Sequence, residues 1–208
     1  MNRFWIVIAA VFMAGLIFTR AVDNEFYFFA GYVILQGMIM ATAWNILGGF
    51  TGYVNFGSAG FFAVGAYTSI ALNQAFDLPL PFLILASGLV CGTIGLATGY
   101  LTLRLKGIYF AISTLAMSIV LETFVNNWEY VGGAAGAYIM TPENSLFFES
   151  YIELLFMTML IIAIAAVSFA RYLSVSRTGQ GLTAIRDDEL AAESMGVPTL
   201  RLKLISAT

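Results

Sequence analysis

The sequence predicts an all-α integral membrane protein, a polytopic helical bundle with about six complete spans and the start of a seventh. Of the 208 residues, 60% are hydrophobic and only 10% are charged, and the mean hydropathy is +0.88. Soluble domains carry about 25% charged residues, so this composition is typical of a protein that lies in the lipid bilayer. We treat residues 1–208 as a single transmembrane domain, with the polar residues 171–203 as a loop within it.

The first two apolar runs cover residues 4–19 and 26–47. The first lies between Arg3 and Arg20 and is short for a bilayer span, which takes about 20 residues. Two interpretations are open: an uncleaved span, or a signal peptide whose basic end contains Arg3. The sequence that follows has no convincing small-x-small cleavage site, which favours the uncleaved span.

The third hydrophobic segment, residues 48–72, is dense in glycine. This density permits a broken helix and a close approach of the backbone to other segments. Asn55 and Ser58 are uncharged polar residues within it. Interrupted spanning helices often form transport sites, because the freed backbone groups can bind a ligand. The segment is therefore either a tightly packed helix with a turn, or a packed helix that also lines a translocation pathway at Asn55 and Ser58.

Three further spans and the first turns of another follow, at residues 78–103, 107–125, 151–170 and 202–208. Four glycines of the fourth span fall on one helical face, which predicts a groove for a neighbouring helix: Gly88, Gly92, Gly95 and Gly99. Glu122 lies near the far end of the fifth span. A carboxylate in a membrane is a functional hypothesis by default, but this position favours the membrane interface.

The charges predict an orientation. If Arg3 is cytoplasmic, alternation of the spans places eight of the nine basic residues on the same side, and only Arg20 falls outside. The opposite side collects acidic residues: Asp23, Glu25, Asp77, Glu122, Glu129, Glu143, Glu149 and Glu153. This distribution follows the positive-inside rule. It places residues 171–203 in the cytoplasm.

Several classes of function are disfavoured. The chain contains no histidine, which removes the commonest proton carrier, metal ligand and nucleophile-activating base. It lacks the GxxxxGK[ST] phosphate-binding loop, and nine Lys and Arg residues are too few for a nucleic-acid surface. Cys91 lies in an apolar run and is expected to be a small buried residue. We therefore expect no enzyme activity, cofactor or metal, and a transport pathway would draw its energy from another protein.

The polar stretch contains one predicted helix, Leu182–Met195. Gly179 and Gly181 precede it, and Gly196 and Pro198 follow it in the order expected of a helix stop. A solvated loop helix is the alternative to a helix that docks onto a partner.

The faces of this predicted helix differ. Leu182, Ile185 and Ala192 gather toward one side, while the charged side chains Arg186, Asp187 and Glu193 point elsewhere. Arg186 and Glu189 are three residues apart, and such an exposed pair would contribute about 0.2–0.5 kcal/mol.

Several stretches resemble one family in the same order along the chain, from residue 43 to residue 203. GLTAIRDDELAAESMGV followed by LRLKL is similar to the cytoplasmic coupling loop of ABC-importer permeases of the branched-chain amino acid (LivM-type) family. NILGGFTGYVNFGSAGFFAVGAYT resembles the glycine-rich third segment of that family, and LTLRLKGIYFAISTLA resembles its turn between the fourth and fifth segments. The GGAAG of the acidic side also has a counterpart.

The resemblance implies a multi-pass subunit of the bacterial inner membrane that imports branched-chain or related amino acids. Its implied partners are the lipid bilayer, a second permease subunit, two cytoplasmic ATP-binding subunits and an extracytoplasmic substrate-binding protein. Members of the family continue through further spans, so residues 1–208 are expected to be a fragment or a truncated form.

The resemblance also assigns the segment Leu182–Gly196 as the coupling helix that seats on an ATP-binding subunit. The residues that match the family pattern, together with the apolar face, are Leu182, Ile185, Arg186, Asp187, Asp188, Glu189, Ala191, Ala192 and Gly196.

Other functions remain as alternatives to this assignment. Related permeases import urea or short amides, and the glycine-rich third segment is also compatible with a channel or facilitator that works alone. A membrane-embedded enzyme is disfavoured by the absence of catalytic groups.

Overall fold

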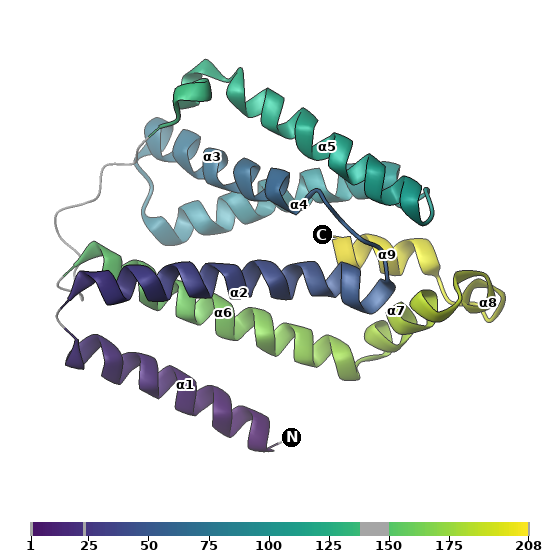
Figure 1. Cartoon of the computed structure of the whole chain (residues 1–208), viewed down its shortest axis with the longest axis horizontal. Helices are drawn as coiled ribbons and strands as arrows, with labels where there is room; N and C mark the ends of the chain where they lie inside the picture. The colour runs from purple at the N-terminus through teal and green to yellow at the C-terminus, as the bar shows by residue number, and fades with distance from the viewer. Residues whose placement is uncertain (1, 23, 138–149, 208) are drawn as a thin grey trace. The chain divides into compact units, whose positions relative to one another are not determined.

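The computed structural model describes residues 2–22, 24–137 and 150–207 (Figure 1). Within this part of the chain every regular element is a helix, which confirms the predicted all-α class. Five helices are long and apolar enough to cross a membrane, and the protein is therefore a multi-pass membrane protein: α1 (Asn2–Ala21), α2 (Glu25–Thr51), α4 (Leu80–Thr102), α5 (Ile108–Asn126) and α6 (Tyr151–Val175).

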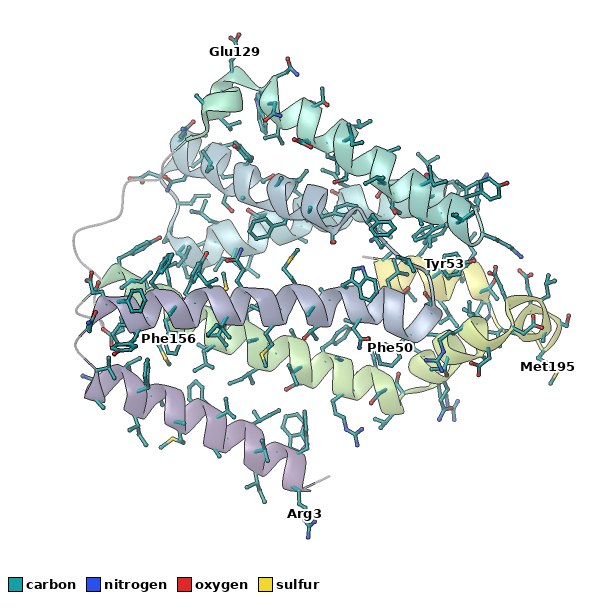
Figure 2. The ribbon with its side chains drawn as sticks, in the orientation of Figure 1. Arg3, Phe50, Tyr53, Glu129, Phe156 and Met195 are labelled. Carbon is teal, nitrogen blue, oxygen red and sulfur yellow. The ribbon has the colours of Figure 1, made fainter. Side chains whose placement is uncertain are left out.

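The chain divides into two compact units. The first contains residues Met1–Ala43 and Met140–Val175, and therefore α1, most of α2 and all of α6. Its core consists of Phe28, Phe156, Met157 and Leu160, and Phe156 is labelled in Figure 2. Gly15 and Gly31 let the helices of this unit approach closely, because a Cβ atom at either position would overlap the side chain of Leu160 or Phe156.

The second unit contains residues Trp44–Ile139 and Ser176–Thr208. Besides α4, α5 and the end of α2 it holds α3 (Ser58–Phe76), α7 (Arg177–Asp187), α8 (Glu189–Ser194), α9 (Thr199–Ala207) and two short 3-10 turns, η1 (Glu129–Val131) and η2 (Gly133–Ala135). Helix α3 packs against both α4 and α5 (Figure 1). Gly60 makes the contact with α5 possible, because its Cβ would lie 3.0 Å from the Ser118 Cα.

The glycine-rich stretch is broken, as its composition permitted. Helix α2 continues through Gly48 and Gly49 to Thr51, residues 52–57 are non-helical, and α3 begins at Ser58. The third hydrophobic segment, residues 48–72, is therefore divided between the end of α2, the non-helical residues 52–57 and most of α3. Gly52 has a φ of +74°, a left-handed value that glycine adopts without steric cost, so the helix ends there. Helix α3 has 19 residues but is not among the five helices that qualify as spans.

Helix α9 packs against the C-terminal end of the predicted glycine face of α4. Gly95 and Gly99 are buried, and a Cβ at Gly99 would lie 3.5 Å from the Cβ of Ala207 on α9. A Cβ at Gly88 would meet nothing within 4 Å among the described residues. Helix α9 thus occupies the groove. It begins at Thr199, earlier than the predicted start at Leu202, and Thr208 lies outside the described residues.

The single predicted helix Leu182–Met195 is wrong, because the structure divides it into α7 and α8. Ser176 accepts a hydrogen bond from the Gly179 N–H at 3.1 Å and caps α7, so this helix begins before Gly179. Asp188 has extended backbone angles, and its carboxylate accepts hydrogen bonds from the N–H groups of Leu190 and Ala191. Aspartate favours this capping conformation over a helix interior, which explains the break.

Candidate functional site

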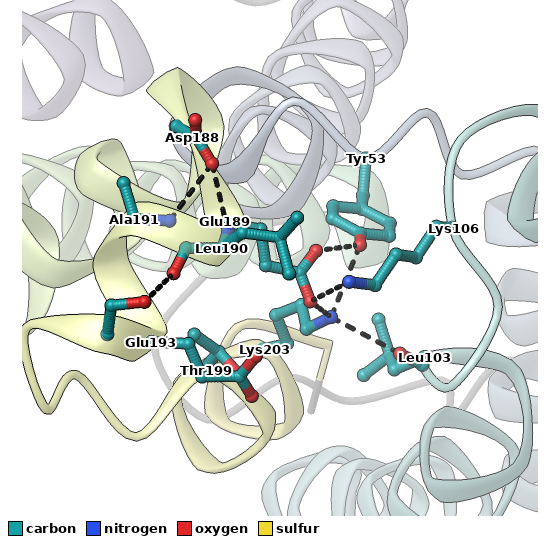
Figure 3. Close-up of polar contacts among 11 residues, drawn as sticks. Tyr53, Leu103, Lys106, Asp188, Glu189, Leu190, Ala191, Glu193, Thr199 and Lys203 are labelled. Carbon is teal, nitrogen blue, oxygen red and sulfur yellow. Dashed lines mark hydrogen bonds and ion pairs between the residues drawn. The ribbon is translucent and has the colours of Figure 1, made fainter.

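Glu189, the first residue of α8, is the centre of a polar cluster in the second unit (Figure 3). Its Oε1 lies 2.8 Å from the Nζ of Lys203 on α9 and 3.7 Å from the Nζ of Lys106 in the turn between α4 and α5. Its Oε2 accepts a hydrogen bond of 2.5 Å from the hydroxyl of Tyr53, in the non-helical segment between α2 and α3. Both lysines of the chain therefore form ion pairs with the same carboxylate, that of Glu189.

The Lys203 side chain is only 3% exposed, so its ammonium depends on protein groups for solvation. Besides the carboxylate of Glu189 it donates to the Leu103 carbonyl at 3.3 Å and to the Tyr53 hydroxyl at 3.2 Å. It also lies 4.7 Å from the centre of the Tyr53 ring, within the range of a cation–π interaction. The buried charge is thus fully partnered.

These contacts set the protonation of the cluster. Burial by itself raises the pKa of Glu189, but hydrogen bonds from Lys203 and Tyr53 and the charges of Lys203 and Lys106 outweigh it and lower this pKa below its ordinary value. Burial and the hydrogen bond to the Glu189 carboxylate raise the pKa of Tyr53. At neutral pH Glu189 is therefore ionised, and Tyr53 keeps the proton that it donates.

The polar cluster packs against an apolar core. The Tyr53 ring packs edge-on against Phe110 at 5.1 Å, within a buried group that includes Leu47, Leu103, Ile185 and Ala192. Leu182, another predicted face residue, is 1% exposed. The apolar face of Leu182, Ile185 and Ala192 predicted from the sequence therefore exists, but these side chains stabilise the unit itself and are not available to another protein.

The outward surface of the α7–α8 hairpin consists of other residues. Asp187, Asp188, Ala191 and Gly196 are exposed there. Leu190 and Met195 are apolar and 67% and 85% exposed, and Met195 lies at the tip of the hairpin (Figure 2). Neither of these two residues stands out in the sequence.

Arg186 does not pair with Glu189, contrary to the prediction. Its guanidinium donates to the Gly49 carbonyl at 3.2 Å and lies 3.6 Å from the carboxylate of Asp187. The helix break at Asp188 removes the i, i+3 geometry on which the predicted pair depended.

No sequence pattern predicts that Glu189 contacts Tyr53, Lys106 and Lys203. Tyr53 lies 136 positions and Lys203 lies 14 positions from Glu189 in the sequence, and only the fold brings the three partners to one carboxylate. One signal was present: the chain has just two lysines, and Lys203 stands in the otherwise apolar sequence LKLI. A lone cation among apolar residues calls for a partner carboxylate.

Asn55 lies beside a small cavity of about 20 Å³ in the second unit, enough for about one water molecule. The polar side chains that line this cavity belong to Asn55, Thr98, Thr102, Thr114 and Ser118. Asn55 shapes the non-helical segment, since its Oδ1 accepts from the Gly57 N–H at 2.7 Å and its carbonyl accepts from the Trp44 indole at 2.8 Å. Ser58 is the first residue of α3 and does not line the cavity.

Comparisons with known proteins agree on one family. The family model described as branched-chain amino acid transport system / permease component matches residues 26–208. The high-affinity branched-chain amino acid transport system permease proteins LivM of Salmonella typhimurium and Escherichia coli are each 28% identical to the chain over 197 residues. Each alignment covers 82% of this chain and 46% of the relative, so the chain spans about half the length of these curated relatives. No solved structure matches.

Proposed function

The chain belongs to the permease-component family of branched-chain amino acid transport systems, and we propose that it is a membrane-spanning subunit of an ATP-driven importer. In this proposal it carries branched-chain or related amino acids into the cytoplasm. ATP hydrolysis takes place on partner chains, consistent with the absence of a phosphate-binding loop from its sequence. The partners are a second permease subunit, two ATP-binding subunits and an extracytoplasmic binding protein, assembled in the bacterial inner membrane.

The observation that supports coupling to a partner is the construction of the α7–α8 hairpin. Its inner face is anchored by Leu182, Ile185 and Ala192, while Leu190 and Met195 are exposed at its outer end. The charge distribution predicts that this end lies in the cytoplasm, where no lipid covers it. Two large apolar side chains on a polar, cytoplasmic tip favour a protein partner, and an ATP-binding subunit is the partner that a permease requires.

The structure changes which residues we expect to contact that partner. Leu190, Met195 and the exposed Asp187, Asp188, Ala191 and Gly196 form the docking surface. Arg186 is half-exposed and is tied to Gly49, so it belongs to the base of the hairpin.

Copurification tests this proposal. A carboxylate introduced by Leu190→Asp or Met195→Asp places a charge in an apolar contact, and we expect recovery of the ATP-binding subunit on the tagged permease to fall at least tenfold. Gln180→Glu adds the same charge at an exposed position on the first turn of α7 and serves as the matched control. Undiminished recovery with both tip variants would overturn the docking surface.

A second measurement addresses the transport mechanism. Purified permease subunits in liposomes, without ATP-binding subunits, are expected to give no uptake of branched-chain amino acids. Uptake under these conditions would instead show a facilitator that works alone.

A further inference from the structure

The Glu189 carboxylate joins four segments of the second unit. It belongs to α8 and contacts Tyr53 in the non-helical segment 52–57, Lys203 on α9 and Lys106 in the turn between α4 and α5 (Figure 3). The Glu189 side chain is 16% exposed, so most of it is enclosed by these partners. A charged side chain with three directed contacts restricts the motion of α8 relative to all three segments.

A second set of contacts joins the α7–α8 hairpin to the end of α2 and the start of the segment 52–57. Arg186 on α7 donates to the Gly49 carbonyl in the last turn of α2. Its aliphatic stem also lies over Gly52, where an added Cβ would be 3.0 Å from the Arg186 Cγ. Contacts from α7 and α8 therefore reach both the last turn of α2 and the non-helical segment that follows it.

The far end of the segment is fixed separately. Asn55 accepts hydrogen bonds from the Trp44 indole and from the Gly57 N–H. The Phe56 N–H donates to the Thr114 hydroxyl on α5 at 3.1 Å. Only Val54 separates the residue that Glu189 binds from the residue that lines the cavity. With so short a connection, a displacement of Tyr53 would pull on Asn55 and strain these contacts, with Gly52 as the pivot.

We infer that Glu189 fastens the non-helical segment 52–57 to α8, so that a displacement of α8 moves Asn55 and changes the cavity beside it. Glu189 is then a positioning residue that acts inside the permease, distinct from the residues that dock the ATP-binding subunit. The source of the displacement rests on the proposed function, whereas the link between α8 and the segment is a property of this chain alone.

Thiol labelling of the segment tests the link. In the full chain, expressed with its partner subunits in membrane vesicles, Cys91→Ala removes the single native cysteine and Val54→Cys places a probe at a position that is 43% exposed. Glu189→Gln keeps the shape of the side chain and removes its charge. We expect it to increase the rate of maleimide labelling at position 54 at least threefold, because Tyr53 is released.

Two further variants complete the comparison. Tyr53→Phe removes the hydrogen bonds of the Tyr53 hydroxyl with Glu189 and Lys203 but retains the ion pair between these two residues, so it is expected to fold and to give a smaller increase in labelling. Glu122→Gln removes one negative charge from an exposed position on α5 and is expected to leave the rate unchanged. Phe56→Cys, at a position that is 55% exposed, replaces the probe if Val54→Cys does not reach the membrane.

The outcomes separate the link from the proposed function. Equal labelling rates in the parent, Glu189→Gln and Tyr53→Phe would overturn the link, as would an equal rise with Glu122→Gln. Unchanged recovery of the ATP-binding subunit with Glu189→Gln supports a role inside the permease, and its loss without a change in labelling would overturn that role. If the ATP-binding subunit fails to copurify even with the parent chain, the proposed function fails and the labelling rates still decide the link.

Discussion

Lys203 and Glu189 form an ion pair of 2.8 Å that closes α8 onto α9, with the lysine side chain almost completely withdrawn from solvent. A pair of this kind contributes little net free energy relative to well-packed apolar residues, but the removal of one partner leaves an uncompensated buried charge. The pair therefore specifies where α8 lies more than it adds to stability.

Removal of both partners is expected to be less harmful than the two single removals added together. Glu189→Gln and Lys203→Met should each destabilise the second unit by about 2–3 kcal/mol, since a buried charged group loses its main partner. The double variant should lower the midpoint of thermal unfolding in detergent by clearly less than the sum of the single effects. Additive shifts would contradict a direct interaction between the two side chains.

The cluster also predicts a response to acid. Glu189 has a lowered pKa in the folded chain, so it stabilises the fold above its ordinary pKa of 4.5, and this contribution is lost as the pH falls through the folded-state value. The unfolding midpoint of the parent should exceed that of Glu189→Gln near pH 7, and the difference should shrink below about pH 4.5. Melting curves of both proteins from pH 7 to pH 3 measure this. A difference that stays constant to pH 3 would show that Glu189 does not act as a carboxylate in the fold.

The helix break at Asp188 is expected to depend on its side-chain acceptor. Asp188→Ala removes the cap of α8 and should cost about 1 kcal/mol, with fraying of α8 and weaker recovery of the ATP-binding subunit. Asp188→Asn keeps an oxygen acceptor and should behave like the parent in both measurements. Equal recovery with the alanine and asparagine variants would argue against a role for the cap.

The contact between α3 and α5 is expected to tolerate no side chain at Gly60. Gly60→Ala would place a Cβ 3.0 Å from the backbone of Ser118 and should destabilise by about 1–3 kcal/mol. Gly88→Ala on α4 introduces the same methyl group where nothing lies within 4 Å, so it should be neutral or slightly stabilising. Unfolding midpoints in detergent compare the two, and equal values would be inconsistent with the packing of α3 on α5.

Asn55 and Ser58 remain our predicted pathway residues. Asn55→Ala is expected to reduce ATP-dependent uptake by the assembled transporter at least tenfold without loss of the ATP-binding subunit, because it removes the side chain that shapes the segment and lines the cavity. Asn127→Ala removes an exposed amide at the end of α5 and should leave uptake unchanged. Uptake by Asn55→Ala at the parent rate would exclude this position from the pathway.

The sequence predicts the helical elements well because apolar runs of bilayer length leave few alternatives to a helix. The break in the helix after Thr51 could also be predicted, since Gly52 and Gly57 lie at its two ends. The division of the polar helix at Asp188 could not be predicted from the sequence. Aspartate occurs both in helix interiors and as a cap, and only the local hydrogen bonds decide between the two. The Glu189 cluster depends on residues up to 150 positions apart, which no local pattern specifies.

The cavity beside Asn55 has room for one water molecule, far less than an amino acid occupies. A pore that conducts an amino acid by diffusion needs a continuous opening, and the cavity beside Asn55 is too small to form part of one. Under the proposed function, with Asn55 in the pathway, the packed helices around Asn55 would have to separate before an amino acid could pass. In the proposed importer, the energy needed to break these close contacts in each cycle would come from the ATP-binding subunits.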